Sequence, residues 1–127
     1  MKTYKPNPQP AKSKDEALEQ IDFVQWVKCH HADLAKFMVA PINEVKGEVY
    51  YQDKLNKMGR KKGAHDVLFL TNPIFTIEFK KAGKDASTVS KEQKEFGETI
   101  ESQGGTSTVC YGCEQAKIAF KEFYKLT

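Results

Sequence analysis

Two short apolar segments joined by a tight turn constrain the fold of this chain more than any other feature of its sequence. Residues 66–71 and 74–80 are rich in branched and aromatic side chains, and the Asn72-Pro73 pair between them is a turn signal. This pattern predicts a β-hairpin. Such a hairpin brings the start of its first strand beside the end of its second strand.

Charged residues occupy those two ends. Asp66 opens the first strand, and Glu78 and Lys80 close the second. Because strand side chains alternate between faces, Glu78 and Lys80 share one face, and the apolar residues between them look toward the core. Two carboxylates that meet across a hairpin repel each other unless a cation lies between them. On these residues alone, an ordinary solvated sheet face is the alternative.

A divalent metal ion could be the cation between the two carboxylates, because Mg²⁺ prefers oxygen ligands and usually takes only one or two protein carboxylates. The sequence therefore predicts a metal site formed by Asp66 and Glu78, to which the backbone carbonyl of Phe79 adds a ligand. A metal-bound water is acidic enough to attack phosphorus. Lys80 would orient that water or offset negative charge on the phosphate.

Further short motifs lie on both sides of the hairpin. They are Glu16-Ala17-Leu18-Glu19-Gln20, Phe23-Val24-Gln25-Trp26, Pro41-Ile42-Asn43-Glu44, the glycine-punctuated segment 55–66, Ile77-Glu78-Phe79-Lys80, Ser90-Lys91-Glu92-Gln93, Gly104-Gly105, Val109-Cys110-Tyr111-Gly112 and Glu114-Gln115-Ala116. Their order over about residues 16–123 resembles the virus-type replication-repair nuclease (VRR-NUC) domain, a branch of the PD-(D/E)XK nucleases. The visible departure is His65, where the family often has proline. We expect His65 to be structural or to contact phosphate rather than to act as a base.

The resemblance implies an α/β fold with a restriction-endonuclease-like core, the element order αβββαβ(α), and a mixed central sheet flanked by helices. It also implies a DNA endonuclease that depends on Mg²⁺ or Mn²⁺ and that, in short phage forms, pairs as dimers on branched DNA. We therefore expect a homodimeric endodeoxyribonuclease that cuts branched or Holliday-junction DNA in phage DNA replication, repair or recombination. The number of metal ions stays open, as does RNA as the substrate.

Two more residues join the site by resemblance. Glu16 is the acid of the first helix and would bind the same metal or a second one, directly or through water; Glu19 replaces it if the helix is rotated. The alternative for Glu16 is a capping box with Ser13. Gln93 is a polar residue on an otherwise apolar helix face, and the resemblance places its amide near the metal site. The alternative for Gln93 is a capping box with Ser90.

The remaining pattern sets the element boundaries. A flexible, basic arm over residues 1–12 precedes a single domain over residues 13–127, which is a usual size for one domain. The expected elements are a helix to about residue 30, a strand over 43–52, the hairpin over 65–81, a polar loop over 82–87, a helix over 90–103, a strand over 106–111 and a helix over 114–125.

Positive charge is concentrated beside the predicted metal hairpin. The net charge is only +3, but one basic cluster directly precedes Asp66 and further lysines follow Glu78. Such side chains neutralise phosphates and give salt-sensitive, sequence-independent binding. The alternative is an ordinary solvated charged surface. The predicted DNA contacts are Lys54, Lys57, Arg60, Lys61, Lys62 and Lys81.

Two rival classes of function remain. One is a non-catalytic DNA-binding module of the same fold, although such a module would not need the intact charged residues of the hairpin. The other is a small zinc or redox protein built on the C-x-x-C pair Cys110 and Cys113, for which we instead expect reduced, packed thiols. The sequence contains no apolar run long enough to span a membrane and no signal-peptide pattern at its start, so we expect a cytoplasmic protein.

Overall fold

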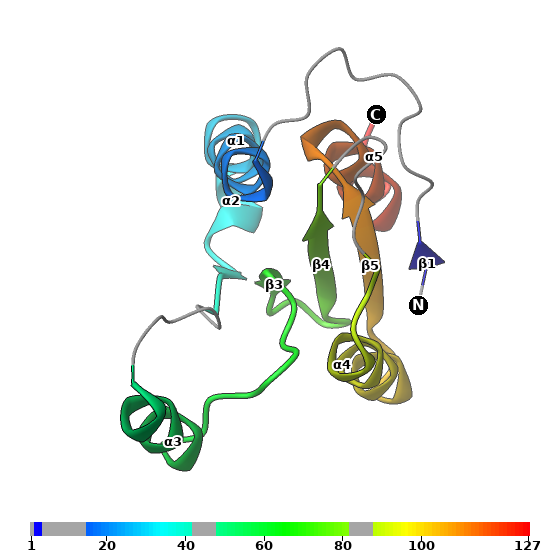
Figure 1. The fold of residues 1–127 in the computed structure, drawn as a ribbon. Helices are drawn as coiled ribbons and strands as arrows, with labels where there is room; N and C mark the ends of the chain where they lie inside the picture. The colour runs from blue at the N-terminus through cyan, green and yellow to red at the C-terminus, as the bar shows by residue number, and fades with distance from the viewer. Residues whose placement is uncertain (1, 4–14, 42–47, 82–87) are drawn as a thin grey trace.

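A mixed β-sheet forms the centre of the computed structural model, which describes residues 2–3, 15–41, 48–81 and 88–127 (Figure 1). Within these ranges the sheet has five strands in the order β1-β5-β4-β3-β2. Their bounds are Lys2–Thr3 (β1), Met38–Val39 (β2), Val67–Phe69 (β3), Phe75–Lys80 (β4) and Thr106–Tyr111 (β5). Strand β5 pairs in parallel with β1 and β4, whereas β3 pairs antiparallel with β2 and β4. The expected α/β fold with a mixed sheet is confirmed.

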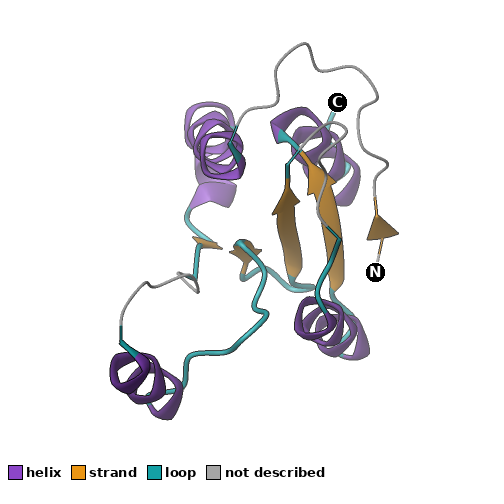
Figure 2. Ribbon diagram, in the orientation of Figure 1, coloured by secondary structure: helices purple, strands orange, loops and turns teal. Residues whose placement is uncertain are grey.

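Helices cover both faces of the sheet (Figure 2). Helices α1 (Glu16–His30) and α5 (Cys113–Phe123) pack on one face, and α4 (Lys91–Ser102) packs on the other. The short helix α2 (Ala32–Ala35) follows α1. With β1, α2 and the helix α3 described below set aside, the elements follow the expected order αβββαβα. None of the helices in the described ranges is both long and apolar enough to cross a membrane.

Strand β4 is buried along its whole length, because both of its faces are covered. Phe75, Ile77 and Phe79 join side chains of α1 and α5 in the hydrophobic core. Glu78 and Lys80 lie on the opposite face and are only 3% and 7% exposed. The predicted alternation of the hairpin is therefore confirmed, and a solvated sheet face is wrong for these two charged residues.

The expected strand over residues 43–52 is wrong where the structure describes it. Residues 49–52 belong to α3 (Val49–Lys57), and residues 42–47 lie outside the described ranges. The Val-Tyr-Tyr run that favours a strand opens this helix, and Arg60 folds back to stabilise its last turns through Gln52 and Asn56. The sheet position next to β3 is instead taken by β2, a two-residue strand.

The N-terminal prediction needs a second correction. Lys2–Thr3 pair with β5, so this part of the expected flexible arm is a strand of the sheet, while residues 4–14 lie outside the description. Helix α1 begins at Glu16 with Asp15 as its N-cap, so the alternative in which Glu16 closes a capping box with Ser13 is wrong. Helix α4 ends as predicted, with Gly104 in the left-handed conformation that closes a helix (φ +84°). The predicted loop over 82–87 is not among the described residues.

Candidate active site

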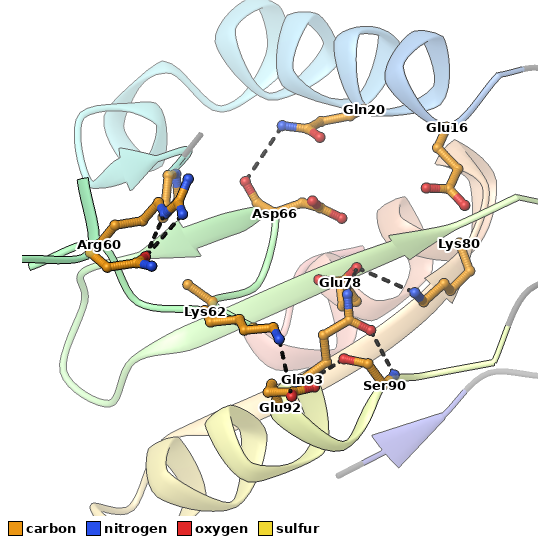
Figure 3. A pocket seen from close by; sticks show the side chains of 14 residues that line it. Glu16, Gln20, Arg60, Lys62, Asp66, Glu78, Lys80, Ser90, Glu92 and Gln93 are labelled. Carbon is orange, nitrogen blue, oxygen red and sulfur yellow. Dashed lines mark hydrogen bonds and ion pairs between the residues drawn. The ribbon is translucent and has the colours of Figure 1, made fainter. Parts of the chain in front are cut away.

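A cleft of about 600 Å³ opens where α1, the end of α3, the start of the hairpin and the first turn of α4 meet (Figure 3). All five residues that the sequence nominates for catalysis line it: Glu16, Asp66, Glu78, Lys80 and Gln93. The other lining residues are Gln20, Pro41, Asn56, Arg60, Lys62, Gly63, Ala64, Ser90 and Glu92. The cleft therefore gathers side chains from segments that are up to 77 residues apart in the sequence (Glu16 to Gln93).

Two carboxylates lie at the centre of this cleft. The register of the hairpin pairs Val67 with Ile77, so the next position places Asp66 opposite Glu78. Asp66 Oδ2 accepts a hydrogen bond of 2.7 Å from the backbone N–H of Phe79. This bond fixes one carboxylate oxygen of Asp66 against β4, at the point where β3 no longer pairs with it.

Hydrogen-bond donors of the described residues reach one oxygen of Glu78. Its Oε2 atom accepts a 3.1 Å hydrogen bond from Gln93 Nε2 and lies 3.8 Å from Lys80 Nζ. Its Oε1 atom is fully buried and has no hydrogen-bond partner among the residues that the structure describes. Buried polar atoms are rarely left without a partner, so this oxygen is a candidate ligand for a bound cation.

The electrostatics of the Asp66 and Glu78 carboxylates also favour a bound cation. Burial, and then the nearby Asp66 carboxylate, raise the pKa of Glu78 to about 9. Burial also raises the pKa of Asp66, and Lys80 offsets only part of the effect on either group. Without a cation, the pair therefore holds a proton at neutral pH. A divalent ion would favour both ionised forms, and oxygen donors are the ligands that Mg²⁺ takes.

Helix α1 adds a third carboxylate to the cleft, that of Glu16, at the edge of β4. Glu16 Oε1 accepts a 3.1 Å hydrogen bond from the backbone N–H of Lys81. Asp66 and Glu16 thus accept hydrogen bonds from the N–H groups of residues 79 and 81 along one edge of β4. The N–H and C=O of one strand residue point to the same side, so the carbonyl of Phe79 also points to this edge. Glu19 points elsewhere, since it accepts the Cys113 N–H at the start of α5.

The carboxylates do not form a three-acid cluster. Among residues 2–3, 15–41, 48–81 and 88–127, no group of three or more His, Cys, Asp or Glu side chains is arranged to hold a metal ion. Asp66 and Glu78 thus supply two carboxylates, which is the usual number for Mg²⁺, and Glu16 lies beside them on a backbone N–H.

Gln93 fills both roles that the sequence offers as alternatives. Ser90 Oγ accepts the Gln93 N–H at 3.1 Å, and Gln93 Oε1 accepts the Ser90 N–H at 2.9 Å, which makes a complete capping box. The Nε2 amide of the same side chain donates to Glu78. The first turn of α4 is thereby fixed by the residue that also orients a carboxylate of the candidate site.

Gln20 is a residue of the cleft to which the sequence assigned no role. Gln20 Nε2 donates a 3.4 Å hydrogen bond to the backbone carbonyl of Asp66, so α1 steadies the segment that carries this aspartate. The signal was present, because Gln20 follows Glu16 by four residues and so lies on the same helix face. What the sequence lacked was any indication of the backbone that faces this helix.

Two of the residues predicted to contact DNA, Arg60 and Lys62, line the cleft. Lys54, Lys57, Lys61 and Lys62 are exposed, and Lys62 also forms a 3.5 Å ion pair with Glu92. The predicted DNA contact of Arg60 stays a prediction, because this side chain lines the cleft. Its guanidinium folds onto α3, with hydrogen bonds of 2.5 Å to Gln52 Oε1 and 2.9 Å to Asn56 Oδ1.

The cysteine pair behaves as packed thiols. Cys110 is fully buried in the core, and Cys113 is 6% exposed at the start of α5. Burial raises the pKa of the Cys113 thiol to about 11, which keeps it protonated and unreactive at neutral pH. Neither thiol joins a metal-binding group of the described residues. The geometry gives no support to a zinc or redox protein built on this pair.

Comparison with known proteins identifies the fold. No protein-family model matches the chain, and no curated protein sequence matches it. Among solved structures, the chain is similar to a protein described as "VRR_NUC domain protein", with a TM-score of 0.73 and 22% sequence identity over 91% of this chain and 92% of that one. The chain has the fold of a VRR-NUC domain. In this VRR-NUC fold, the cleft occupies the edge of β4 where α1 and α4 converge.

Proposed function

We propose that this protein is a Mg²⁺-dependent endonuclease that hydrolyses phosphodiester bonds in DNA. The observation that carries the proposal is the Asp66–Glu78 pair, whose carboxylates are buried together with raised pKa values and with Glu78 Oε1 lacking a partner among the described residues. The similarity in fold to a protein described as a VRR_NUC domain protein supports it. Mn²⁺ has the same ligand preference and is the expected substitute.

Asp66 and Glu78 would hold the metal, together with the backbone carbonyl of Phe79. The hydrogen bonds already made by each group favour this arrangement, because they leave Glu78 Oε1 without a partner among the described residues and hold Asp66 at the edge of β4 to which the Phe79 carbonyl points. Glu16 lies along that edge and would take part through water or at a second ion. A bound metal supplies an acidic water and neutralises charge that develops on the phosphate.

Lys80 is the residue we assign to the reacting phosphate. Its ammonium group is almost completely buried and lies 3.8 Å from Glu78 Oε2, which gives it a fixed position in a poorly hydrated site. A preorganised cation in such surroundings stabilises developing negative charge more than an exposed lysine does. Gln93 keeps Glu78 in place and so fixes the distance between the carboxylate and the ammonium group.

The basic residues that precede and follow the hairpin in the sequence suit a polyanion. Tyr50, Lys54 and Lys57 lie four and then three residues apart on α3, so they share one exposed face of this helix. Lys61, Lys62 and Lys81 continue the positive charge toward the metal site. A domain of this size has little surface for reading sequence, so we propose branched or junction DNA as the substrate, in phage DNA replication, repair or recombination. Symmetric cutting of a junction requires a two-fold dimer.

A cleavage panel tests the proposal. The purified protein is incubated with single-stranded, duplex, flap and four-way DNA in Mg²⁺, Mn²⁺ or EDTA. We expect metal-dependent cutting that favours branched DNA. Lys80→Ala should lose at least about 100-fold in cleavage rate while retaining DNA binding, whereas Lys94→Ala, an exposed lysine on α4, should cut normally.

Calorimetric titration with Mn²⁺, in the presence and absence of DNA, provides the second arm. Uptake of metal that is lost in Glu78→Gln is the expected result. Absence of metal uptake in both conditions, together with no cutting of any DNA, would overturn the proposal. Unchanged cutting by Lys80→Ala would remove this lysine from the mechanism.

A further inference from the structure

His65 is a buried polar residue beside the candidate metal site. Its imidazole is fully buried, with Nε2 2.9 Å from the backbone carbonyl of Gln93 and Nδ1 2.9 Å from Thr76 Oγ1. The ring also packs against Phe96 of α4, with 4.8 Å between ring centroids. Both nitrogens and the ring face thus have partners among the described residues.

The partners fix which nitrogen carries the proton. A carbonyl oxygen can only accept, so Nε2 must donate to Gln93. In the neutral ring Nδ1 is then an acceptor, and it accepts a hydrogen bond from the Thr76 hydroxyl. One tautomer satisfies every polar atom of this group. Burial lowers the pKa of His65 and so keeps the ring neutral.

Each polar contact of His65 lies on a segment that carries a residue of the candidate metal site. Asp66 is its neighbour in the chain. Thr76 lies two residues before Glu78 on the same face of β4. Gln93 donates its side-chain amide to Glu78 Oε2. A single imidazole therefore joins the three segments that supply the two carboxylates and the amide that orients one of them.

The segment before His65 is also fitted closely to α4. Gly63 has φ +85°, and a Cβ atom placed on it would come within 2.5 Å of the backbone carbon of Glu92. Lys62 adds the ion pair with the Glu92 side chain at 3.5 Å. Because these contacts hold the segment against α4 independently of the imidazole, variants of His65 are expected to fold.

We propose that His65 is a positioning residue that fixes the first turn of α4 where Gln93 presents its amide to Glu78. The effect on metal binding rests on the proposed function, but the effect on the Gln93 amide does not. Proline, which the resembled family often has at this position, offers no side-chain hydrogen bond, so here the side chain supplies a link that backbone stiffness alone cannot.

Three variants separate positioning from simple stabilisation. His65→Phe keeps a ring against Phe96 and removes both hydrogen bonds. His65→Gln retains a donor near the position of Nε2. Thr76→Val is the matched control, because it removes one hydrogen bond of His65 and leaves the bond to Gln93 intact. Urea unfolding of all three variants measures how much stability each substitution costs.

The first readout is the side-chain amide resonance of Gln93 in ¹⁵N-labelled, metal-free protein, assigned by its loss in Gln93→Ala. We expect His65→Phe to shift this resonance, whereas His65→Gln and Thr76→Val should leave it close to its original position. The second readout is the Kd for Mn²⁺. Loss of an outer partner typically weakens metal binding by about 10- to 100-fold, and this loss is expected for His65→Phe but not for Thr76→Val.

A double-variant cycle completes the test. If His65 acts through the Gln93 amide, His65→Phe should weaken Mn²⁺ binding no further in a Gln93→Ala background. An unshifted Gln93 resonance in His65→Phe, or independent losses that multiply in the double variant, would overturn the inference. If the unmodified protein takes up no Mn²⁺, the proposed function fails instead, and the resonance alone decides the role of His65.

Discussion

Glu78 should make the metal-free protein less stable as the pH rises, and replacing it by glutamine should remove that dependence. The carboxyl group is 3% exposed and faces a second carboxylate, so its ionisation in the folded protein is opposed by both burial and charge. Glu78→Gln keeps the shape of the side chain and an oxygen that can accept the Gln93 amide. It removes only the group that ionises.

The magnitude follows from the pKa values. The pKa of Glu78 is about 9 in the folded protein and 4.5 in an unperturbed glutamate. Between these values the folded state binds one more proton than the unfolded state, so stability is lost as the pH rises. The loss is about 1.4 kcal/mol per pH unit, or about 2 kcal/mol from pH 7 to pH 8.5. The contribution is fully present below pH 4.5 and is gone above pH 9.

Urea unfolding in EDTA at pH 7 and pH 8.5 measures this effect. His65 does not interfere, because its lowered pKa places its titration below this window. Glu78→Gln should show a much smaller loss of stability than the unmodified protein, and should be the more stable of the two at pH 8.5. Saturating Mn²⁺ should flatten the dependence of the unmodified protein only, because the ion favours the ionised carboxylates.

A matched substitution on the surface keeps the test specific. Glu98→Gln changes an exposed glutamate of α4 and should leave the pH dependence unchanged. If the unmodified protein and Glu78→Gln lose the same stability between pH 7 and pH 8.5, then Glu78 is ionised in the metal-free fold. In that case the reasoning that links its buried oxygen to a cation is wrong.

Three further outcomes are expected. Replacing both Lys54 and Lys57 by alanine should reduce the slope of log K against log salt for duplex binding by about 2, because each phosphate contact contributes about 0.9; an unchanged slope in fluorescence titrations would place DNA elsewhere. Gly63→Ala should cost about 2–5 kcal/mol in urea unfolding, because it combines left-handed strain with a clash against α4. At pH 8, the exposed Cys29 should react with iodoacetamide rapidly, whereas Cys113, with a pKa of about 11, should react slowly in mass spectra; equal rates would show that its burial is transient.

Local patterns in the sequence were sufficient for the parts of the site that lie close together in the chain. Alternation over β4 placed Glu78 and Lys80 on one face, and the hairpin brought Asp66 opposite Glu78. The capping pattern after Ser90 located the start of α4 and gave Gln93 its orientation. Each of these features depends on interactions within a few residues or across one tight turn, which sequence spacing records directly.

Strand propensity gave a wrong prediction where pairing with a neighbouring strand is absent. The Val-Tyr-Tyr run at the start of α3 favours a strand, but β2 pairs with β3 instead, and the run forms a helix. The sequence also does not show that the guanidinium of Arg60 folds back onto α3. Strand preference reflects neighbouring strands and burial, so it predicts little where no neighbouring strand is present.

The sequence by itself determined which groups are available for chemistry and which lie next to one another across the hairpin. Only the tertiary structure decided that Glu16 rather than Glu19 lines the cleft, and that His65 joins α4 to β4. It also decided how strongly Glu78 resists ionisation. The physical reason is that side-chain direction along α1, removal of water and the distance between charges all depend on the packing of segments that are far apart in the chain.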